Sequence, residues 1–237
     1  MTAYRRSRTP GLIDPTAVGP AYWSEVLSDS PLALWKLAES SGSTMVDSSG
    51  NGRDGVYTAP PTLGHLSLIE GVGDTCASFT PSDHATVADA EWMDVNNLTV
   101  EAVVVFDNLS SNRGVVSRDS GSGSSRDWKL YGYSNGNLYA GLLSPGGSGV
   151  EAGAPVSTGT AHHVAMVHDG STLKLFIDGS LEASTAAAFN TRQNAQAIHV
   201  ARYSSAYHAG EIQGVAIYGA ALSDARILAH AAAGGFA

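Results

Sequence analysis

The chain has 237 residues, a length that suits one large all-β domain or two small domains. Its apolar fraction of 43% is enough to build a hydrophobic core, and 27 glycines against three lysines favour a turn-rich β protein over a helical one. The net charge of −9 excludes a general nucleic-acid-binding role, the single cysteine excludes an internal disulfide, and apolar runs such as AVVVF are too short to cross a membrane.

Residues 1–20 are interpreted as an extended arm ahead of a domain of residues 21–237. The arm is rich in proline and glycine and shows no hydrophobic periodicity. It carries Arg5, Arg6 and Arg8, and because the whole chain has a charge of −9, the chain without these three arginines has −12. No apolar segment follows the charged residues, so we expect no secretory signal. Either the arm is a flexible tail, or it becomes ordered on a partner.

The first half of the domain is expected to alternate short strands with polar turns. We expect a helical turn over 22–27, a core strand over 32–39, a polar glycine-rich loop over 47–55, two short strands about a turn within 76–89, and a valine-rich strand over 98–106. Cys76 lies in the apolar run TCASF and is expected to be a small buried core residue.

The second half continues this pattern. Residues 127–143 predict a hairpin whose turn is Asn135-Gly136, and residues 162–184, HHVAMVHDGSTLKLFIDGSLEAS, predict a three-stranded meander with Asp-Gly turns. We expect further strands over 197–205 and 210–219, then a short amphipathic helix with Ser223 as its N-cap and a Gly-Gly stop. Many short strands and little helix indicate an all-β sandwich or barrel.

Five stretches in this order make the chain resemble the laminin G-like, concanavalin A-like jelly-roll superfamily in its bacterial and bacteriophage form. They are LALWKLAESSGSTMVDSSGNGRDGVY, CASFTPSDHATVADA, NLTVEAVVVF, GTAHHVAMVHDGSTLKLFIDGSLEAS and AGEIQGVAIYGAALSDARILAH, and they span most of residues 22–233. The resemblance implies an all-β fold, in which two curved antiparallel sheets form a jelly-roll sandwich with loops clustered at its rims. To this fold we add the extended N-terminal arm and the short C-terminal helix.

Two positions depart from the family's pattern. Val103 stands where members often have a tryptophan, and the closing strand reads IQGV where an acid often helps to hold a structural calcium. Asp47, Asn51 and Asp54 offer oxygens in the early loop, but calcium takes about six to eight of them. We therefore expect an Asx-rich turn without metal, and no cofactor, with structural calcium as the alternative.

No catalytic residues are expected. Glycoside hydrolases need two carboxylates about 5–10 Å apart across the sugar, and the Glu-x-Asp-x-x-Glu cluster of the sandwich hydrolases is absent. Glu101 has no acid two residues further along its strand. His162 and His163 are adjacent in a strand and point to opposite faces, so we expect one to pack inside and the other to face solvent. A Ser/His/Asp nucleophile is not expected, because Gly-x-Ser-x-Gly is missing.

Aromatic side chains are the candidate glycan-binding residues. Sandwich lectins hold a sugar with rings that stack on its apolar face and with polar groups that fix its hydroxyls. The candidates are Trp128, Tyr131 and Tyr133 in one strand and Tyr203 and Tyr207 in a later segment. Tyr131 and Tyr133 share a face of their strand, and Trp128 lies on the opposite face. The alternative is that these rings pack at sheet edges or in a protein interface.

Three functions agree with the sequence, and we favour the first. It is a non-enzymatic bacteriophage virion protein, either a capsid decoration protein or a minor tail protein, whose arm docks on the particle and whose lectin-like domain holds host-surface glycans. Location in the virion explains an extracellular type of fold without an export signal, because lysis releases the particles. A homotrimer is expected by family analogy only. The alternatives are a free or secreted carbohydrate-binding lectin module and an enzyme.

Overall fold

The computed structural model describes residues 22–119, 126–144, 149–191 and 195–237, so the arm with Arg5, Arg6 and Arg8 lies outside the described residues. The helices are α1 (Tyr22–Ser28), the 3₁₀ turn η1 (Glu91–Met93) and α2 (Asp224–Ala233). The strands are β1 (Ala33–Trp35), β2 (Thr44–Met45), β3 (Gly55–Ala59), β4 (Thr62–Leu66), β5 (Thr75–Phe79), β6 (His84–Val87), β7 (Leu98–Val105), β8 (Arg113–Asp119), β9 (Arg126–Gly132), β10 (Asn137–Leu143), β11 (Gly149–Pro155), β12 (Ala161–His168), β13 (Thr172–Ile177), β14 (Ser180–Ala186), β15 (Ile198–Val200), β16 (Arg202–Tyr203), β17 (Ala206–Tyr207) and β18 (Gly210–Tyr218).

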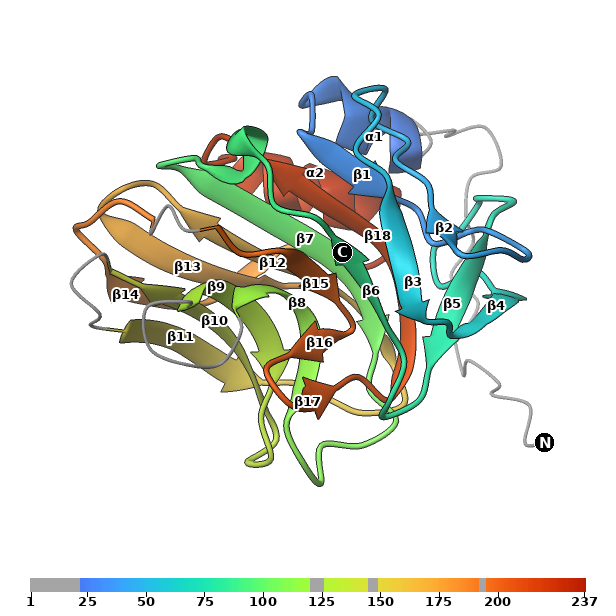
Figure 1. The fold of residues 1–237 in the computed structure, drawn as a ribbon. Helices are drawn as coiled ribbons and strands as arrows, with labels where there is room; N and C mark the ends of the chain where they lie inside the picture. Colours follow the sequence, from blue (N-terminus) through green and yellow to red (C-terminus); the bar gives the residue numbers. More distant parts are fainter. Residues whose placement is uncertain (1–21, 120–125, 145–148, 192–194) are drawn as a thin grey trace, which may run out of the picture.

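Two antiparallel sheets of eight strands each pack face to face (Figure 1). Sheet A has the order β14-β13-β12-β7-β18-β5-β4, and β1 also pairs with β18. Sheet B has the order β11-β10-β9-β8-β15-β6-β3-β2, and β16 and β17 form a separate hairpin. This architecture confirms the predicted all-β sandwich with a short C-terminal helix. None of the described helices is long and apolar enough to cross a membrane.

Most expected elements form, and two differ in an informative way. The strand expected over 32–39 ends at Trp35, because Leu37 has a φ of 58° and leaves the extended conformation. The two strands expected within 76–89 are β5 and β6, but they do not pair with each other. β5 lies in sheet A and β6 in sheet B, so the turn between them carries the chain from one layer to the other.

Helices α1 and α2 cover the outer face of sheet A (Figure 1). Trp23 of α1 packs near Val103 of β7, and Ile227 of α2 packs on Phe176 of β13. β7 is therefore buried at all eight of its positions, with sheet B on one side and helices on the other. This two-sided burial explains why the second half of the strand, AVVV at residues 102–105, shows no alternation of apolar and polar residues.

A buried carboxylate connects these helices to sheet A. Glu101, in the middle of β7, is fully buried on the helix side of the sheet. Its oxygens lie 3.1 Å from Nε2 of His163 in β12 and 3.0 Å from Nδ1 of His230 in α2. Tyr218 of β18 donates its hydroxyl to the same carboxylate at 2.6 Å. Two strands and one helix are thus held by a single side chain.

The connection continues from α2 to α1. Nε2 of His230 lies 2.9 Å from Oδ2 of Asp29, which directly follows α1, and Nε of Arg226 donates to the same oxygen at 2.7 Å. Both ring nitrogens of His230 therefore face carboxylates, an arrangement that requires both to donate. His230 is held as an imidazolium between Glu101 and Asp29.

The protonation states follow from opposing effects in the buried site. Burial alone would lower the pKa of His230, but the hydrogen bond and charge of Glu101 outweigh it and raise the pKa above 6.5. Burial alone would raise the pKa of Glu101, but hydrogen bonds with His163 and His230 outweigh it and hold the pKa well below 4.5.

We expect Glu101→Gln to lower the free energy of unfolding by about 3 kcal/mol, because it removes the fully buried one of the two carboxylates that hold the His230 imidazolium. The stability from the depressed pKa of Glu101 is present above pH 4.5 and is lost as the pH falls towards the folded value. The stability from the raised pKa of His230 is present below pH 6.5 and is lost as the pH rises through the folded value.

Urea denaturation of wild type and Glu101→Gln, at pH values below, within and above the interval from 4.5 to 6.5, measures the effect. The difference in unfolding free energy between wild type and variant should be largest between pH 4.5 and pH 6.5. A difference that is independent of pH would contradict the assigned charges.

Candidate functional site

Four tyrosine rings gather on the face of sheet B that points away from sheet A. They are Tyr131 of β9, Tyr133 just after it, Tyr139 of β10 and Tyr203 of β16, and we refer to them as the tyrosine face. The centroid of the Tyr131 ring lies 6.2, 5.6 and 5.0 Å from those of the other three, in that order. Tyr131 is buried at the centre, Tyr133 is 40% exposed, and the other two are half-buried. Three rings therefore reach solvent around a buried one.

Trp128 does not belong to this face. It shares β9 with Tyr131 but points the other way, and it is 2% exposed in the core between the sheets. The expectation that Trp128 contributes to a glycan site is corrected by this burial, since a ligand on the tyrosine face cannot reach its ring.

Two glycines leave room for the side chains of Tyr139 and Lys129 to lie flat on the sheet. A Cβ atom at Gly153 of β11 would collide with the ring of Tyr139, and a Cβ atom at Gly141 of β10 would lie 2.7 Å from Cε of Lys129. Each side chain therefore crosses the backbone of the neighbouring strand. The Tyr139 ring in particular lies low over β11 as a flat apolar surface.

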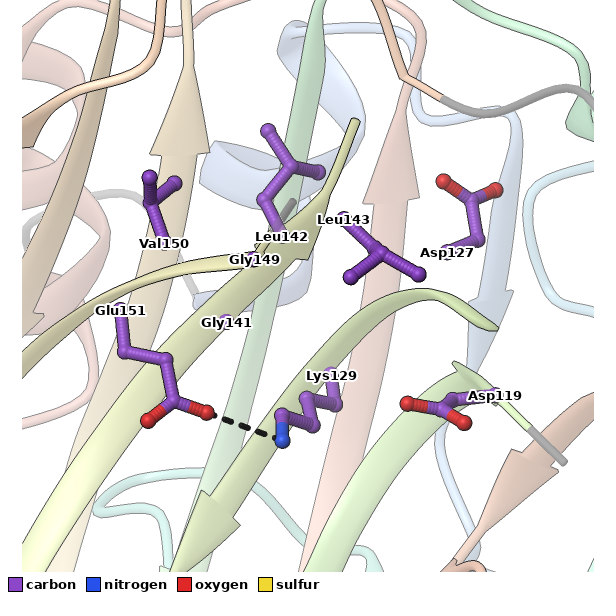
Figure 2. Close-up of a pocket in the computed structure, with 9 residues that line it drawn as sticks. All are labelled: Asp119, Asp127, Lys129, Gly141, Leu142, Leu143, Gly149, Val150 and Glu151. Carbon is purple, nitrogen blue, oxygen red and sulfur yellow. Dashed lines mark ion pairs between the residues drawn. The ribbon is translucent and has the colours of Figure 1, made fainter. Parts of the chain in front are cut away.

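The ion pair of Lys129 and Glu151, which is drawn in Figure 2, contacts the tyrosine face. Nζ of Lys129 lies 2.9 Å from Oε1 of Glu151 and donates to the hydroxyl of Tyr203 at 3.1 Å. Tyr131 donates its hydroxyl to the same oxygen of Glu151 at 3.0 Å. Burial and then the charge of Glu151 raise the pKa of Tyr131, so its phenol keeps its proton. The Glu151 side chain is 41% exposed, and its carboxylate can accept further hydrogen bonds from a ligand.

A cavity of about 330 Å³ opens next to this ion pair (Figure 2). Asp119 and Asp127 lie on one side and Glu151 on the opposite side, with Lys129 between them, and Leu142, Leu143 and Val150 add apolar side chains to the lining. The lining residues are Asp119, Asp127, Lys129, Gly141, Leu142, Leu143, Gly149, Val150 and Glu151. This volume lies at the lower end of the range for small-molecule sites, about 300–1,000 Å³.

The β16–β17 hairpin lies over β8 on the same face of sheet B. Ser117 Oγ donates to the carbonyl of Arg202 at 2.8 Å, and a Cβ atom at Gly114 would collide with the hairpin backbone. The register pairs Arg202 with Tyr207 and Tyr203 with Ala206, so the two tyrosines point to opposite sides of the hairpin. Tyr203 joins the tyrosine face, whereas the Tyr207 ring lies 5.6 Å from that of His84 in β6.

Asp47, Asn51 and Asp54, the candidates for calcium, are engaged in hydrogen bonds within their loop and with the segment around β1. The carboxylate of Asp47 accepts hydrogen bonds from three backbone N–H groups at 2.9–3.0 Å. Asn51 donates to the carbonyl of Leu32 at 3.0 Å, and Asp54 accepts from the backbone of Asp47 at 2.8 Å. Within the described part of the chain, no three His, Cys, Asp or Glu residues are grouped as a metal site.

Ser157, His162 and Asp178 form a hydrogen-bonded chain that no sequence motif indicated. Nε2 of His162 lies 2.7 Å from Oγ of Ser157, and Nδ1 lies 2.7 Å from Oδ2 of Asp178. This is the atom order of a nucleophile, base and acid. Ser157 is exposed, and His162 is largely shielded, with 11% of its side chain exposed. His162 therefore does not face solvent as expected, while His163 is the buried partner of Glu101.

The sequence prediction missed Tyr139, Lys129 and Glu151. Lys129 shares a strand face with Tyr131 by the two-residue period, and Tyr139 pairs directly with Tyr131 once Asn135-Gly136 sets the hairpin register. Those two signals were available in the sequence. Glu151 follows the connection after β10, and nothing local shows that it returns to the same face.

Comparison with known protein families identifies the family of the chain. Residues 79–228, more than half of the chain, match the family described as Concanavalin A-like lectin/glucanases superfamily (Laminin_G_3). The chain belongs to this superfamily. A search of curated proteins gave no significant match for this laminin G-like chain.

Solved structures show the same fold at low sequence identity. The binding domain of Paraclostridial Mosquitocidal Protein 1 has a TM-score of 0.66 at 13% identity, over 85% of this chain and 52% of that one. The receptor-binding domain of botulinum neurotoxin C/D mosaic serotype has 0.67 at 16%, over 86% and 51%. The botulinum neurotoxin serotype D ligand-binding domain, in complex with N-acetylneuraminic acid, has 0.65 at 17%, over 90% and 52%. The chain spans about half the length of each of these domains.

Proposed function

We propose that this laminin G-like domain binds a glycan on the tyrosine face. The observation that carries the proposal is the set of three solvent-reaching rings of Tyr133, Tyr139 and Tyr203 beside the Lys129–Glu151 pair. Such rings stack on the apolar C–H face of a pyranose, while an ammonium, a carboxylate and phenols bind its hydroxyl groups. The adjacent cavity gives room for substituents of the sugar.

The relatives support binding as the role of the fold. The superfamily includes lectins by its description, and the similar solved structures are described as binding domains of toxins. One of them holds N-acetylneuraminic acid. Because this chain corresponds to about half of that domain, the support concerns a binding role and not the identity of the sugar.

We expect the double variant Tyr133→Ala/Tyr139→Ala to weaken glycan binding at least about tenfold, equivalent to about 1.4 kcal/mol, because it removes two stacking surfaces. A glycan array identifies the ligand, and calorimetry measures its affinity. Leu66→Ser is the control, since Leu66 is 91% exposed on β4, in the other sheet. Unchanged affinity in the double variant with an unchanged melting temperature would show that the tyrosine face is not the site.

We further propose that the domain is not an enzyme. Two of the three carboxylates that line the cavity are paired with cations: Glu151 with Lys129 at 2.9 Å, and Asp127 with Arg118 at 3.3 Å. These ion pairs engage the carboxylate oxygens, whereas a glycosidase needs a carboxyl group that is free to donate a proton to the glycosidic oxygen.

The Ser157–His162–Asp178 chain gives this proposal a direct test. A reactive serine needs donors for the developing oxyanion in a water-excluded site, but Ser157 is exposed. A fluorophosphonate probe should therefore label wild type no more than Ser157→Ala, as measured by intact-protein mass spectrometry. Stoichiometric labelling of wild type that is lost in Ser157→Ala would make the chain a serine hydrolase.

For the location we propose a bacteriophage virion, with residues 1–20 docking on capsid or tail proteins and with a homotrimer as the assembly. The support is the separation of charge between Arg5, Arg6 and Arg8 and the rest of the chain, which favours salt-sensitive docking on an acidic surface. Removal of residues 1–20 should leave folding intact and abolish particle binding.

Peptide mass spectrometry of density-purified particles measures the copy number. Hundreds of copies per particle indicate capsid decoration, and a few indicate the tail. Absence from particles would favour the free lectin.

A further inference from the structure

The side of the β16–β17 hairpin that points away from the tyrosine face carries an arginine with unused donors. Nε of Arg202 donates to the carbonyl of Ser204 at 2.8 Å, and neither terminal nitrogen has a hydrogen bond or ion pair with the described residues. The other arginines whose side chains are described each use a terminal nitrogen within the protein; they are Arg53, Arg113, Arg118 and Arg226. A half-buried guanidinium whose two terminal –NH₂ groups make no hydrogen bond with the described residues can bind an anion through both of them.

The groups around Arg202 hold it in place without cancelling its charge. Its guanidinium carbon lies 5.5 Å from the centroid of the Tyr207 ring, and that ring packs on His84, which in turn lies 6.3 Å from the His199 ring. Burial and then the charge of Arg202 lower the pKa of His199 to about 4. Burial also lowers the pKa of His84, with Arg202 adding to the effect against the raising influence of Ser82 and Asp83. Near neutral pH both imidazoles are uncharged, so Arg202 supplies the positive charge of this cluster.

The two sides of the hairpin differ in charge but belong to one surface. On the tyrosine face, Lys129 and Glu151 neutralise each other at 2.9 Å. On the other side, Arg202 and Tyr207 stand directly opposite each other in the register, next to rings of β6 and β15. A ligand that covers both sides of the hairpin therefore contacts an uncharged aromatic surface on the tyrosine face and the positively charged guanidinium of Arg202 on the other side.

We propose that Arg202, Tyr207, His84 and His199 form a second subsite that binds the carboxylate of an acidic sugar, while a neighbouring sugar of the same oligosaccharide lies on the tyrosine face. The planar guanidinium matches a carboxylate with two parallel hydrogen bonds, and Tyr207 presents a ring to the pyranose that carries it. The ligand class is an oligosaccharide that contains a carboxylated pyranose such as a uronate. This inference rests on the proposed glycan function and specifies its ligand.

Calorimetry with two oligosaccharides of equal length tests the subsite. One is a linear oligo-uronate, and the other is the same oligomer with its carboxyl groups methyl-esterified. Wild type should bind the acid form about tenfold more tightly than the ester, as expected for one carboxylate–guanidinium pair. In Arg202→Gln the two affinities should become equal, with the affinity for the ester unchanged.

Two further variants test whether the preference for the acid form comes from the charge of Arg202 or from a general effect of losing an arginine on the fold. Arg202→Lys loses the same bond to Ser204 but keeps the positive charge, so it should retain part of the preference for the acid. Arg53→Gln is the matched control, because Arg53 also stacks on an aromatic ring, Trp92 at 4.4 Å, but at another place in the fold, and it should keep the full preference.

The outcomes distinguish this inference from the proposed function. An acid preference that persists in Arg202→Gln, together with loss of binding in Tyr133→Ala/Tyr139→Ala, would overturn the second subsite and leave the tyrosine face standing. Failure of wild type to prefer the acid form would also overturn it. Acid binding that depends on Arg202 but not on Tyr133 and Tyr139 would show an anion site separate from the tyrosine face, against the shared ligand proposed.

Discussion

The buried charge of Glu101 is the interaction on which the arrangement of the molecule depends. A carboxylate without solvent is stable only when several donors surround it, and these donors come from β12, β18 and α2. Through His230 the same requirement reaches Asp29 and fixes the position of α1. Apolar packing alone would allow the helices to slide over sheet A, whereas directional hydrogen bonds to one carboxylate define a single position.

This arrangement determines which surface is left for a ligand. Sheet A has one face in the core and the other under α1 and α2, so its central strand β7 is buried on both sides. Among the described residues, α1 and α2 both pack on sheet A and not on the outer face of sheet B, which carries tyrosines, a lysine–glutamate pair and an arginine. The same sandwich thus has a closed side that provides stability and an open side that is polar and aromatic.

The sequence predicted the architecture well because its signals were local. Asp-Gly and Asn-Gly turns with alternating strands define the β9–β10 hairpin and the β12–β13–β14 meander, and the Ser223 cap defines the start of α2. The binding surface was only partly predictable. The two-residue period places Tyr131 and Tyr133 together, but the grouping of Tyr203 with them requires the hairpin to lie over β8. The role of Glu101 was missed, since its partners lie 62 and 129 residues away in the chain.

The position of β18 in sheet A has a consequence for biosynthesis. This strand lies between β7 and β5 and also pairs with β1, yet it is nearly the last element of the domain to be made. A nascent chain that has left the ribosome only as far as β17 lacks an interior strand of sheet A and the helix that supplies His230. The sandwich therefore cannot close progressively from its N-terminal end, and the valine-rich β7 must remain unprotected, or shielded by a chaperone, until residues 210–233 emerge.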